Sequence, residues 1–242
     1  MNAVDFRQVS FQIGERKILK DLTFSIEPGE TLVLLGRSGS GKTTALRLIN
    51  GMIMPTSGAV SVDGKTTRQW DLVRLRRGIG YVIQEAGLFP HFTIERNVGL
   101  VPRLEGWSED RIAKRVAELL ESVSLPGGDY LRRLPAELSG GQRQRVGVAR
   151  ALAADPKILL FDEPFGALDP VTRLDLQQEF LRLRSSLGKT SVFVTHDVRE
   201  AMKLASRIAL LHEGTLAFIG APDRFRECRH PEAQAFLEVL RA

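Results

Sequence analysis

The sequence predicts an α/β protein whose core is a doubly wound, mostly parallel sheet, with a helical segment inserted into it. Three observations favour this fold class. A glycine-rich loop separates an apolar strand, residues 31–35, from a helical pattern that continues to about residue 50. Two later apolar runs, residues 158–161 and 191–195, end in carboxylate or imidazole side chains. The chain from about residue 87 to 155 is mostly helical in its pattern.

The other elements follow from their periodicity. Residues 5–9 and 22–26 alternate between apolar and polar side chains, which is typical of half-exposed strands. Residues 79–83 form another short apolar run and predict a strand. Residues 109–123 predict a helix, because five apolar side chains share one of its faces: Ile112, Val116, Leu119, Leu120 and Val123. Residues 231–240 predict a short amphipathic helix.

The loop at residues 36–43, GRSGSGKT, is a candidate phosphate cradle. Its three glycines permit backbone angles that let consecutive N–H groups turn inward at the positive end of a helix. Lys42 would then reach the β and γ phosphates, and the Thr43 hydroxyl would bind Mg²⁺. We therefore expect the nucleotide to contact Gly36, Arg37, Ser38, Gly39, Ser40, Gly41, Lys42, Thr43 and Thr44.

Two carboxylates follow the buried strand at residues 158–161. Adjacent strand residues point to opposite sides, so Asp162 and Glu163 are expected to have different roles. We assign Asp162 to Mg²⁺ and Glu163 to the attacking water as general base. Pro164 is expected to stop the strand.

Two further polar residues follow strand ends. His196 comes directly after residues 191–195, and the ends of parallel strands are where ligands bind in open sheets. Gln84 comes after residues 79–83, and its amide oxygen is a candidate ligand of Mg²⁺ or of the attacking water. Both residues are therefore candidate catalytic groups.

A second glycine-bearing turn opens a helix at residues 138–142, LSGGQ. Ser139 and Gln142 have the spacing of a capping box, so one interpretation is that Ser139 only caps the predicted helix at 141–154. The other interpretation is an anion site, because two consecutive glycines lower helix stability unless the backbone must approach something closely. One nucleotide needs one cradle, so a second cradle indicates a nucleotide held between two copies of the chain.

Taken together, these residues resemble the ATP-binding cassette family, the ATPase subunits of ABC transporters. GRSGSGKT resembles the Walker A loop, Gln84 the Q-loop glutamine, LSGGQ the signature, ILLFDEP the Walker B strand, residues 167–169 the D-loop and His196 the switch histidine. The resemblance implies ATP and Mg²⁺ as cofactors and a head-to-tail dimer. In that dimer Ser139, Gly140, Gly141 and Gln142 of one copy, with Asp169, complete the γ-phosphate site of the other.

The resemblance covers essentially the whole chain, residues 1–242, as a single ABC ATPase domain. Residues 1–86 and 156–242 correspond to the P-loop core with an N-terminal antiparallel β subdomain, and residues 87–155 to the helical subdomain with the signature. The family usually has an aromatic residue before Walker A that stacks on adenine. Ile13 occupies the matching position here, so either Phe11 replaces it or adenine rests on an aliphatic surface, which leaves base selectivity open.

The segment at residues 80–107 resembles the osmoprotectant importers for glycine betaine, choline and carnitine. This implies a homodimer that drives transmembrane permease subunits from the cytoplasmic face of the membrane, with a substrate-binding protein as an indirect partner. Many ATPase subunits of that class continue into regulatory repeats, whereas this sequence stops at residue 242, which predicts a different regulation. A phospholipid or amino acid cargo, or a soluble non-transport ABC ATPase, is the alternative.

Composition agrees with a globular ATPase. Its 43% hydrophobic content is ordinary, and a single cysteine, Cys228, excludes an internal disulfide and suits a reducing compartment. No signal pattern or membrane-spanning run is expected. The net charge of +5 comes with arginines at helical spacing, which we interpret as solvated helix faces rather than a nucleic-acid surface; they are Arg74, Arg76, Arg77, Arg143, Arg145 and Arg150.

Overall fold

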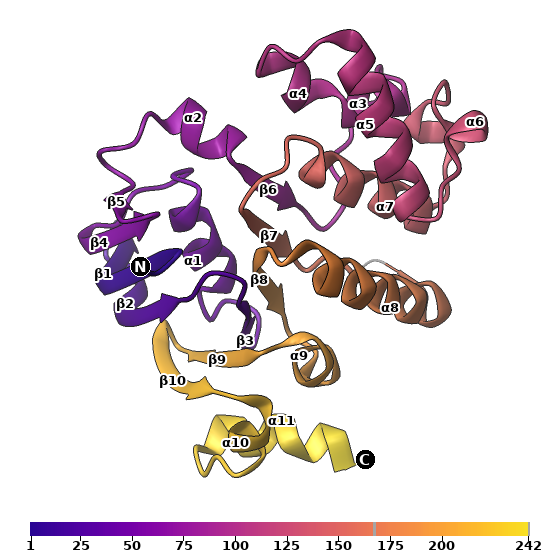
Figure 1. Cartoon of the computed structure of the whole chain (residues 1–242). Helices are drawn as coiled ribbons and strands as arrows, with labels where there is room; N and C mark the ends of the chain where they lie inside the picture. Colours follow the sequence, from indigo (N-terminus) through magenta and orange to yellow (C-terminus); the bar gives the residue numbers. More distant parts are fainter. Residues whose placement is uncertain (167, 242) are drawn as a thin grey trace. The chain divides into compact units, whose positions relative to one another are not determined.

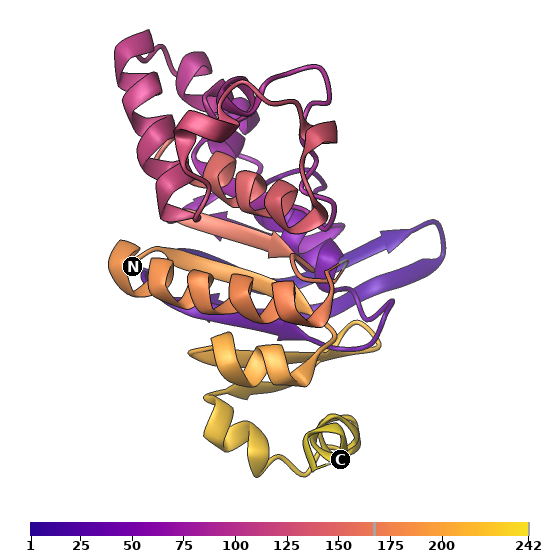
Figure 2. The ribbon, with the colours of Figure 1, turned by 90° about the vertical axis from the view of Figure 1, so that its right-hand side faces the viewer.

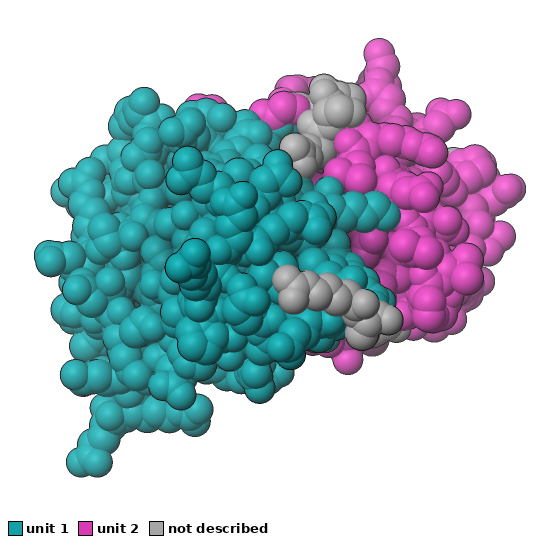
Figure 3. Space-filling view, turned by 90° about the horizontal axis from the view of Figure 1, so that it is seen from below, with its two compact units in different colours: residues 1–76, 189–242 teal, residues 77–188 magenta. Residues whose placement is uncertain are grey.

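The computed structural model describes residues 1–166 and 168–241 (Figure 1), and the chain divides into two compact units. Unit 1 comprises residues 1–76 and 189–242, and unit 2 comprises residues 77–188 (Figure 3). The helical subdomain predicted at residues 87–155 is shorter than unit 2. Its existence as a separate subdomain stays a prediction.

Unit 1 contains an antiparallel sheet in the order β2-β1-β4-β5. Its strands are β1 (Val4–Ile13), β2 (Arg16–Ile26), β4 (Ser57–Val62) and β5 (Lys65–Thr66). The predicted strands at 5–9 and 22–26 lie inside β1 and β2, which are longer at the ends where they meet. Phe6 stacks on Phe24 across the pair, with ring centroids 4.4 Å apart, so an aromatic contact fixes one face of this sheet.

The second sheet segment of unit 1 has the order β10-β9-β3-β8. Its strands are β3 (Thr31–Leu35), β8 (Thr190–Thr195), β9 (Arg207–His212) and β10 (Thr215–Gly220). Every residue of β3 and β8 is buried. This confirms the prediction from their mostly apolar sequences that both strands are parallel and covered on both faces. β3 pairs in parallel with both neighbours, and only β10 is antiparallel.

The helices of unit 1 are α1 (Lys42–Ile49), α9 (Val198–Leu204), α10 (Pro222–Arg226) and α11 (Pro231–Arg241), and α2 (Leu72–Arg77) ends at the boundary with unit 2. α1 contacts β4 and β8, and α9 contacts β3. α10 lies beside β10, and α11 beside α9, at the yellow end of the chain (Figures 1 and 2). The helix predicted at residues 231–240 is therefore confirmed as α11.

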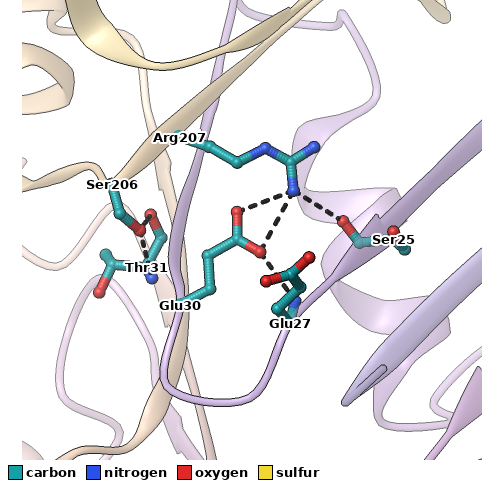
Figure 4. A network of polar contacts seen from close by, with 6 residues as sticks. All are labelled: Ser25, Glu27, Glu30, Thr31, Ser206 and Arg207. Carbon is teal, nitrogen blue, oxygen red and sulfur yellow. Dashed lines mark hydrogen bonds and ion pairs between the residues drawn. The ribbon is translucent and has the colours of Figure 1, made fainter. Parts of the chain in front are cut away.

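A half-buried ion pair ties the start of β3 to β9 (Figure 4). One guanidinium nitrogen of Arg207, Nη1, donates to both carboxylate oxygens of Glu30, at 3.0 and 3.2 Å, and to the Ser25 carbonyl at 3.3 Å. Beside it, the Ser206 hydroxyl accepts from the Thr31 N–H at 2.8 Å and donates to the Thr31 carbonyl at 3.0 Å. These bonds fix the N-terminal end of β3. The C-terminal end of the same strand leads into the phosphate loop.

Unit 2 is mainly helical around a parallel strand pair, β6 (Ile79–Val82) and β7 (Ile158–Asp162). Its helices are α3 (Ile94–Val98), α4 (Leu100–Leu104), α5 (Glu109–Ser122), α6 (Gly127–Tyr130), the short 3₁₀ helix η1 (Pro135–Glu137), α7 (Gly140–Leu152) and α8 (Pro170–Leu187). The five apolar side chains assigned to one face of residues 109–123 are all buried, which confirms that helix. Within the described residues, no helix combines the length and the apolar character needed to cross a membrane.

Candidate functional site

The candidate phosphate loop of unit 1 joins the end of β3 to the start of α1. Gly41 immediately precedes the helix with φ +101°, and a Cβ there would lie 2.4 Å from Cδ2 of Leu19. Gly39 also has a positive φ of +80°. Because Gly41 has no side chain, the first N–H groups of α1 are not capped by it and can face an anion.

Lys42, the first residue of α1, folds back over this loop. Its side chain is 4% exposed, and Nζ donates to the carbonyls of Gly36 at 2.7 Å and Arg37 at 2.8 Å. Thr43 and Thr44 follow it, both half-buried. The ammonium group is thus held at the mouth of the loop, where a phosphate would need a counter-charge.

The remaining loop residues differ in exposure. Ser38 and Gly39 are exposed, whereas Ser40 is buried and its hydroxyl has no hydrogen-bond partner among the described residues. The Arg37 side chain points away from the loop interior, because its Nε donates to Oε1 of Glu232 in α11 at 2.7 Å. The side chain of Arg37 therefore has a structural partner in addition to its predicted role.

His196 lies at the same edge of the sheet as the phosphate loop. Leu35, the last residue of β3, pairs with Thr195, the last residue of β8, so Gly36 and His196 follow the paired positions directly. His196 is exposed. Unit 1 therefore brings together two of the motifs that the sequence singled out, as expected for the ends of parallel strands.

The two candidates for the adenine contact lie near the end of β1. Phe11 is half-buried and pairs with Leu19, the residue that touches Gly41 of the phosphate loop, which places this strand end beside the loop. Ile13 lies two residues further along, opposite Arg16, and is 66% exposed. The choice between the two residues stays open, with Ile13 the more accessible.

In unit 2, Gln84 and Glu163 both lie just beyond the paired ends of β6 and β7, since Val82 pairs with Phe161. The two side chains meet around Gly166. A Cβ on Gly166 would lie 3.3 Å from Nε2 of Gln84 and 3.7 Å from Oε2 of Glu163. A glycine at this position thus leaves room for both groups, which sequence reasoning did not anticipate.

Glu163 itself has an unusual backbone. Its φ is +47°, in the left-handed region that residues with a side chain rarely adopt, and β7 ends one residue earlier at Asp162. The expectation that Asp162 and Glu163 alternate as strand neighbours is therefore wrong, because Glu163 lies beyond the end of the strand. Strained backbone of this kind is commonly found at functional positions.

Asp162 accepts a hydrogen bond from the Tyr81 hydroxyl of β6 at 3.2 Å. The sequence analysis did not select Tyr81, although a phenol inside an otherwise apolar strand was a detectable signal. Tyr81 orients one carboxylate oxygen of Asp162, so we expect it to support this residue without contacting the nucleotide.

The turn at residues 138–142 forms the predicted capping box. The Ser139 hydroxyl accepts from the Gln142 N–H at 3.2 Å, and Oε1 of Gln142 accepts from the Ser139 N–H at 2.9 Å. A Cβ on Gly141 would lie 2.4 Å from Cγ2 of Thr172 in α8, whereas the nearest described atom to that position on Gly140 is 4.0 Å away. Internal packing therefore explains Gly141 but not Gly140.

Asp169 caps helix α8. Its Oδ1 accepts from the N–H groups of Val171 at 3.1 Å and Thr172 at 3.0 Å. Hydrogen bonds from the Thr172 side chain and backbone lower the pKa of the Asp169 carboxyl from its usual value, so it stays ionised at neutral pH. Ala167, the first residue of the predicted D-loop, lies outside the described residues.

The arginines of α7 are not a solvated face, which corrects the sequence interpretation. Arg145 forms an ion pair with Glu179 of α8, and both side chains are mostly buried. Arg150 donates to the carbonyls of Ala86 and Gly87 at 2.6 Å, and burial lowers its pKa. Arg143 donates to the Leu138 carbonyl. These cations are used inside unit 2, so the positive net charge overstates the basic surface.

The predicted Mg²⁺ ligands are divided between the units, with Thr43 in unit 1 and Gln84 and Asp162 in unit 2. Their donor atoms are a hydroxyl, an amide oxygen and a carboxylate, which fit a hard cation such as Mg²⁺. Among the described residues, no group of three or more His, Cys, Asp or Glu side chains is placed to hold a metal by itself.

The chain is similar to proteins of known families. The ABC transporter family model matches residues 19–166. The chain is 51% identical to a glycine betaine/carnitine/choline transport ATP-binding protein of Bacillus subtilis, over 93% of this chain and 58% of the relative. It is 47% identical to a glycine betaine uptake system ATP-binding protein of Escherichia coli, over 90% of this chain and 71% of the relative.

Solved structures show the same fold. A dimeric ATP-binding cassette in a post-hydrolysis state, bound to ADP and phosphate, superposes with a TM-score of 0.81 and 36% identity, over 90% of this chain and 98% of that chain. A component of a Clostridium perfringens ABC transporter complex gives a TM-score of 0.83 at 26% identity, over 98% and 99%.

These matches confirm the predicted fold class, an ABC ATPase fold. The chain spans little more than half the length of the first curated relatives it matches. Its similarity extends across both units, from the phosphate loop to the strand that ends at Asp162. The chain belongs to the ABC transporter family.

Proposed function

We propose that this chain is the ATP-hydrolysing, energy-coupling subunit of an ABC importer for quaternary-amine osmoprotectants. One observation supports this most strongly: about half of the residues are identical, over nearly the whole chain, to ATP-binding proteins named for glycine betaine, choline and carnitine transport. A carnitine transport ATP-binding protein of Listeria monocytogenes, for example, is 50% identical over 93% of this chain.

In this proposal the loop at residues 36–43 binds the phosphates of ATP through its N–H groups and Lys42. Glu163 accepts a proton from the attacking water, Gln84 and His196 orient that water and the γ-phosphate, and Asp162 and Thr43 hold Mg²⁺. Mg²⁺, when bound, neutralises the charge that develops on the phosphate oxygens. The position of Gln84 and Glu163 beside Gly166 and the pairing of β3 with β8 support these roles.

A second copy of the chain supplies the other cradle. Ser139, Gly140 and Gly141 of one copy contact the γ-phosphate bound by the other, with Asp169 nearby, so that two ATP close the dimer and hydrolysis reopens it. The exposed, unpacked face of Gly140 supports this role, and so does the dimeric ADP-bound relative.

Closure of the dimer would move the permease subunits, which carry the pore. We therefore expect the chain at the cytoplasmic face of the membrane as a peripheral subunit, with a binding protein delivering the cargo on the other side. Another cargo is the competing hypothesis, because a sulfate/thiosulfate import ATP-binding protein of Synechococcus elongatus is also 44% identical. A soluble non-transport role is the second alternative.

The test is to isolate the tagged Glu163→Gln variant from detergent-solubilised native membranes with ATP present and to identify its partners by mass spectrometry. Loss of the base should slow turnover by about 10²-fold or more and preserve the ATP-bound dimer with its permease. Lys42→Ala is the matched control that should lose nucleotide binding. Recovery of soluble partners alone would contradict the transporter proposal.

The cargo requires a separate measurement. The binding protein recovered with the permease should bind glycine betaine, choline or carnitine in calorimetry, and sulfate or amino acids should not compete. Binding of sulfate instead would retain the importer and change its cargo.

A further inference from the structure

A network of charged and imidazole side chains extends from Arg37 of the phosphate loop, and its other members have no part in the proposed chemistry. It joins three elements of unit 1 that are far apart in the sequence. Arg37 comes from the loop, His212 from the end of β9, and His230 and Glu232 from the start of α11. Glu232 is the centre of this network.

Both carboxylate oxygens and the backbone N–H of Glu232 have neighbours in this network. Its Oε1 accepts from Nε of Arg37 at 2.7 Å, and its Oε2 lies 3.6 Å from Nδ1 of His212. Its backbone N–H donates to Nδ1 of His230 at 3.2 Å, which fixes the main chain at the start of α11. The imidazoles of His212 and His230 meet edge to face, with ring centroids 5.7 Å apart.

Burial makes the contact with Arg37 important. The Glu232 side chain is 8% exposed, whereas that of Arg37 is 70% exposed. A buried carboxylate requires a compensating charge, and the guanidinium of Arg37 supplies it at hydrogen-bond distance. Arg37 is consequently drawn toward α11 rather than left free in solvent.

The loop is not packed against solid protein on this side. A cavity of about 460 Å³ lies here, bounded by the loop, the β9–β10 turn and α11; its lining residues are Arg37, Ser38, Gly39, Ser40, Leu211, His212, Glu213 and Glu232. Close packing secures the two ends of the loop: a Cβ on Gly36 would lie 2.4 Å from the Leu211 carbonyl oxygen, and one on Gly41 would lie 2.4 Å from Cδ2 of Leu19. On this side, the position of the first turn of the loop therefore depends on the hydrogen bond from Arg37 to Glu232.

We propose that Glu232 is a positioning residue of the phosphate loop and that α11 sets nucleotide affinity through it. Arg37 connects the two sites: its side chain binds Glu232, and its carbonyl accepts from Nζ of Lys42 at 2.8 Å. When Glu232 fixes the Arg37 side chain, it also fixes the Arg37 carbonyl, which orients the ammonium group of Lys42. The inference rests on the proposed role of the loop in phosphate binding.

The test is a double-mutant cycle on the full chain with Glu232→Gln, Arg37→Gln and both together. We expect each single variant to weaken binding of a fluorescent ATP analogue by about fivefold to tenfold, because the exposure of Arg37 to solvent weakens its charged hydrogen bond. The double variant should be no weaker than either single one, because both remove the same contact. Arg37→Lys, which retains the charge, should recover part of the affinity.

The split between KM and kcat separates positioning from general damage. Glu232→Gln should raise KM for ATP several-fold with a smaller effect on kcat, since neither Glu163 nor its partners in unit 2 are altered. The matched control is Glu109→Gln, which breaks an exposed pair with Arg103 of similar length, at 2.7 Å, and should leave ATP affinity unchanged. Additive losses in the cycle, or equal losses in kcat and melting temperature without a change in affinity, would overturn the proposal.

Lys42→Ala, measured beside these variants, distinguishes a failure of the proposed phosphate site from a failure of the positioning role of Glu232. If Lys42→Ala binds ATP normally, the phosphate site itself is wrong and the positioning role fails with it. If Lys42→Ala loses binding while Glu232→Gln binds like the wild type, only the role of Glu232 is wrong.

Discussion

The two glycine-bearing turns that open helices α1 and α7 look alike in sequence and differ in construction. At the phosphate loop, Gly41 adopts φ +101° beside Leu19, and a buried lysine closes the loop onto its own carbonyls. At the signature turn, Ser139 and Gln142 satisfy each other in a capping box, and Gly140 faces open space. The first turn needs glycine for its own backbone, and the second has a glycine that its own unit does not require.

One chain thus has a turn with its own buried cation and a turn without one. The loop supplies a cation, whereas the signature turn supplies a helix start, a hydroxyl and no buried charge. A turn like that at residues 138–142 is expected to bind an anion only weakly by itself. It is better suited to complete a phosphate site in which a cation already balances the phosphate charge. Four substitutions sharpen or break this contrast.

The largest effect is expected for Gly41→Ala. The substitution places a side chain in the left-handed region and against Leu19, so we expect a loss of about 2–4 kcal/mol in unfolding free energy, together with loss of nucleotide binding. Urea unfolding and an ATP-binding titration measure both. Gly39→Ala is the control: it shares the positive φ, but no described atom lies within 4 Å, so about 1 kcal/mol is expected. Equal losses would contradict the contact with Leu19.

Gly141→Ala should cost about 1–3 kcal/mol, because its Cβ would overlap Cγ2 of Thr172. Thr172→Ser removes that methyl group, so the double variant should recover most of the lost stability in thermal unfolding. A failure of Thr172→Ser to rescue would mean that Gly141 is required for something other than packing against α8.

Ser139 can be tested with its two roles separated. Ser139→Ala removes the cap and should cost about 1 kcal/mol of stability, whereas Ser139→Asp restores a good cap but places a negative charge where the phosphate is proposed to bind. We expect both to lower ATP turnover at least about tenfold, with the aspartate variant the more stable and the less active. Full turnover in Ser139→Ala would reduce the residue to a helix cap.

The smallest effect on folding is expected for Gly140→Ala. Alanine favours the helix by up to about 1 kcal/mol and meets no described neighbour, so stability should stay the same or rise. Turnover should nevertheless fall if a phosphate approaches this backbone. A variant that is both more stable and fully active would remove Gly140 from the site.

The contrast also shows how far the sequence alone could lead. The buried strands β3 and β8, the glycine-rich loop between β3 and α1 and the capping box were predictable because each follows from local pattern: β3 and β8 are mostly apolar, and Ser139 has Gln142 at the capping distance. The proximity of Gly36 and His196 also followed, since both extend parallel strands.

Contacts between distant residues were not predictable. Arg145 and Arg150 resemble a solvated face in sequence, yet they bind Glu179 and the carbonyls of Ala86 and Gly87, which only the packing of unit 2 reveals. The left-handed backbone of Glu163 and the space at Gly166 depend equally on tertiary context. The partner of Arg37, Glu232, lies almost two hundred residues away, and no periodicity marks the pair.

The central claim is that a complete site takes its two cradles from different copies of the chain, and a tandem dimer tests it most directly. In a Glu163→Gln background, Lys42→Ala and Ser139→Glu are placed either in the same half or in opposite halves, and the ATP retained per dimer is counted. With shared sites, opposite halves leave one intact site and the same half leaves none. We therefore predict retained ATP only in the opposite-half dimer. Retention only in the same-half dimer would show that each copy builds its own site and would contradict the account.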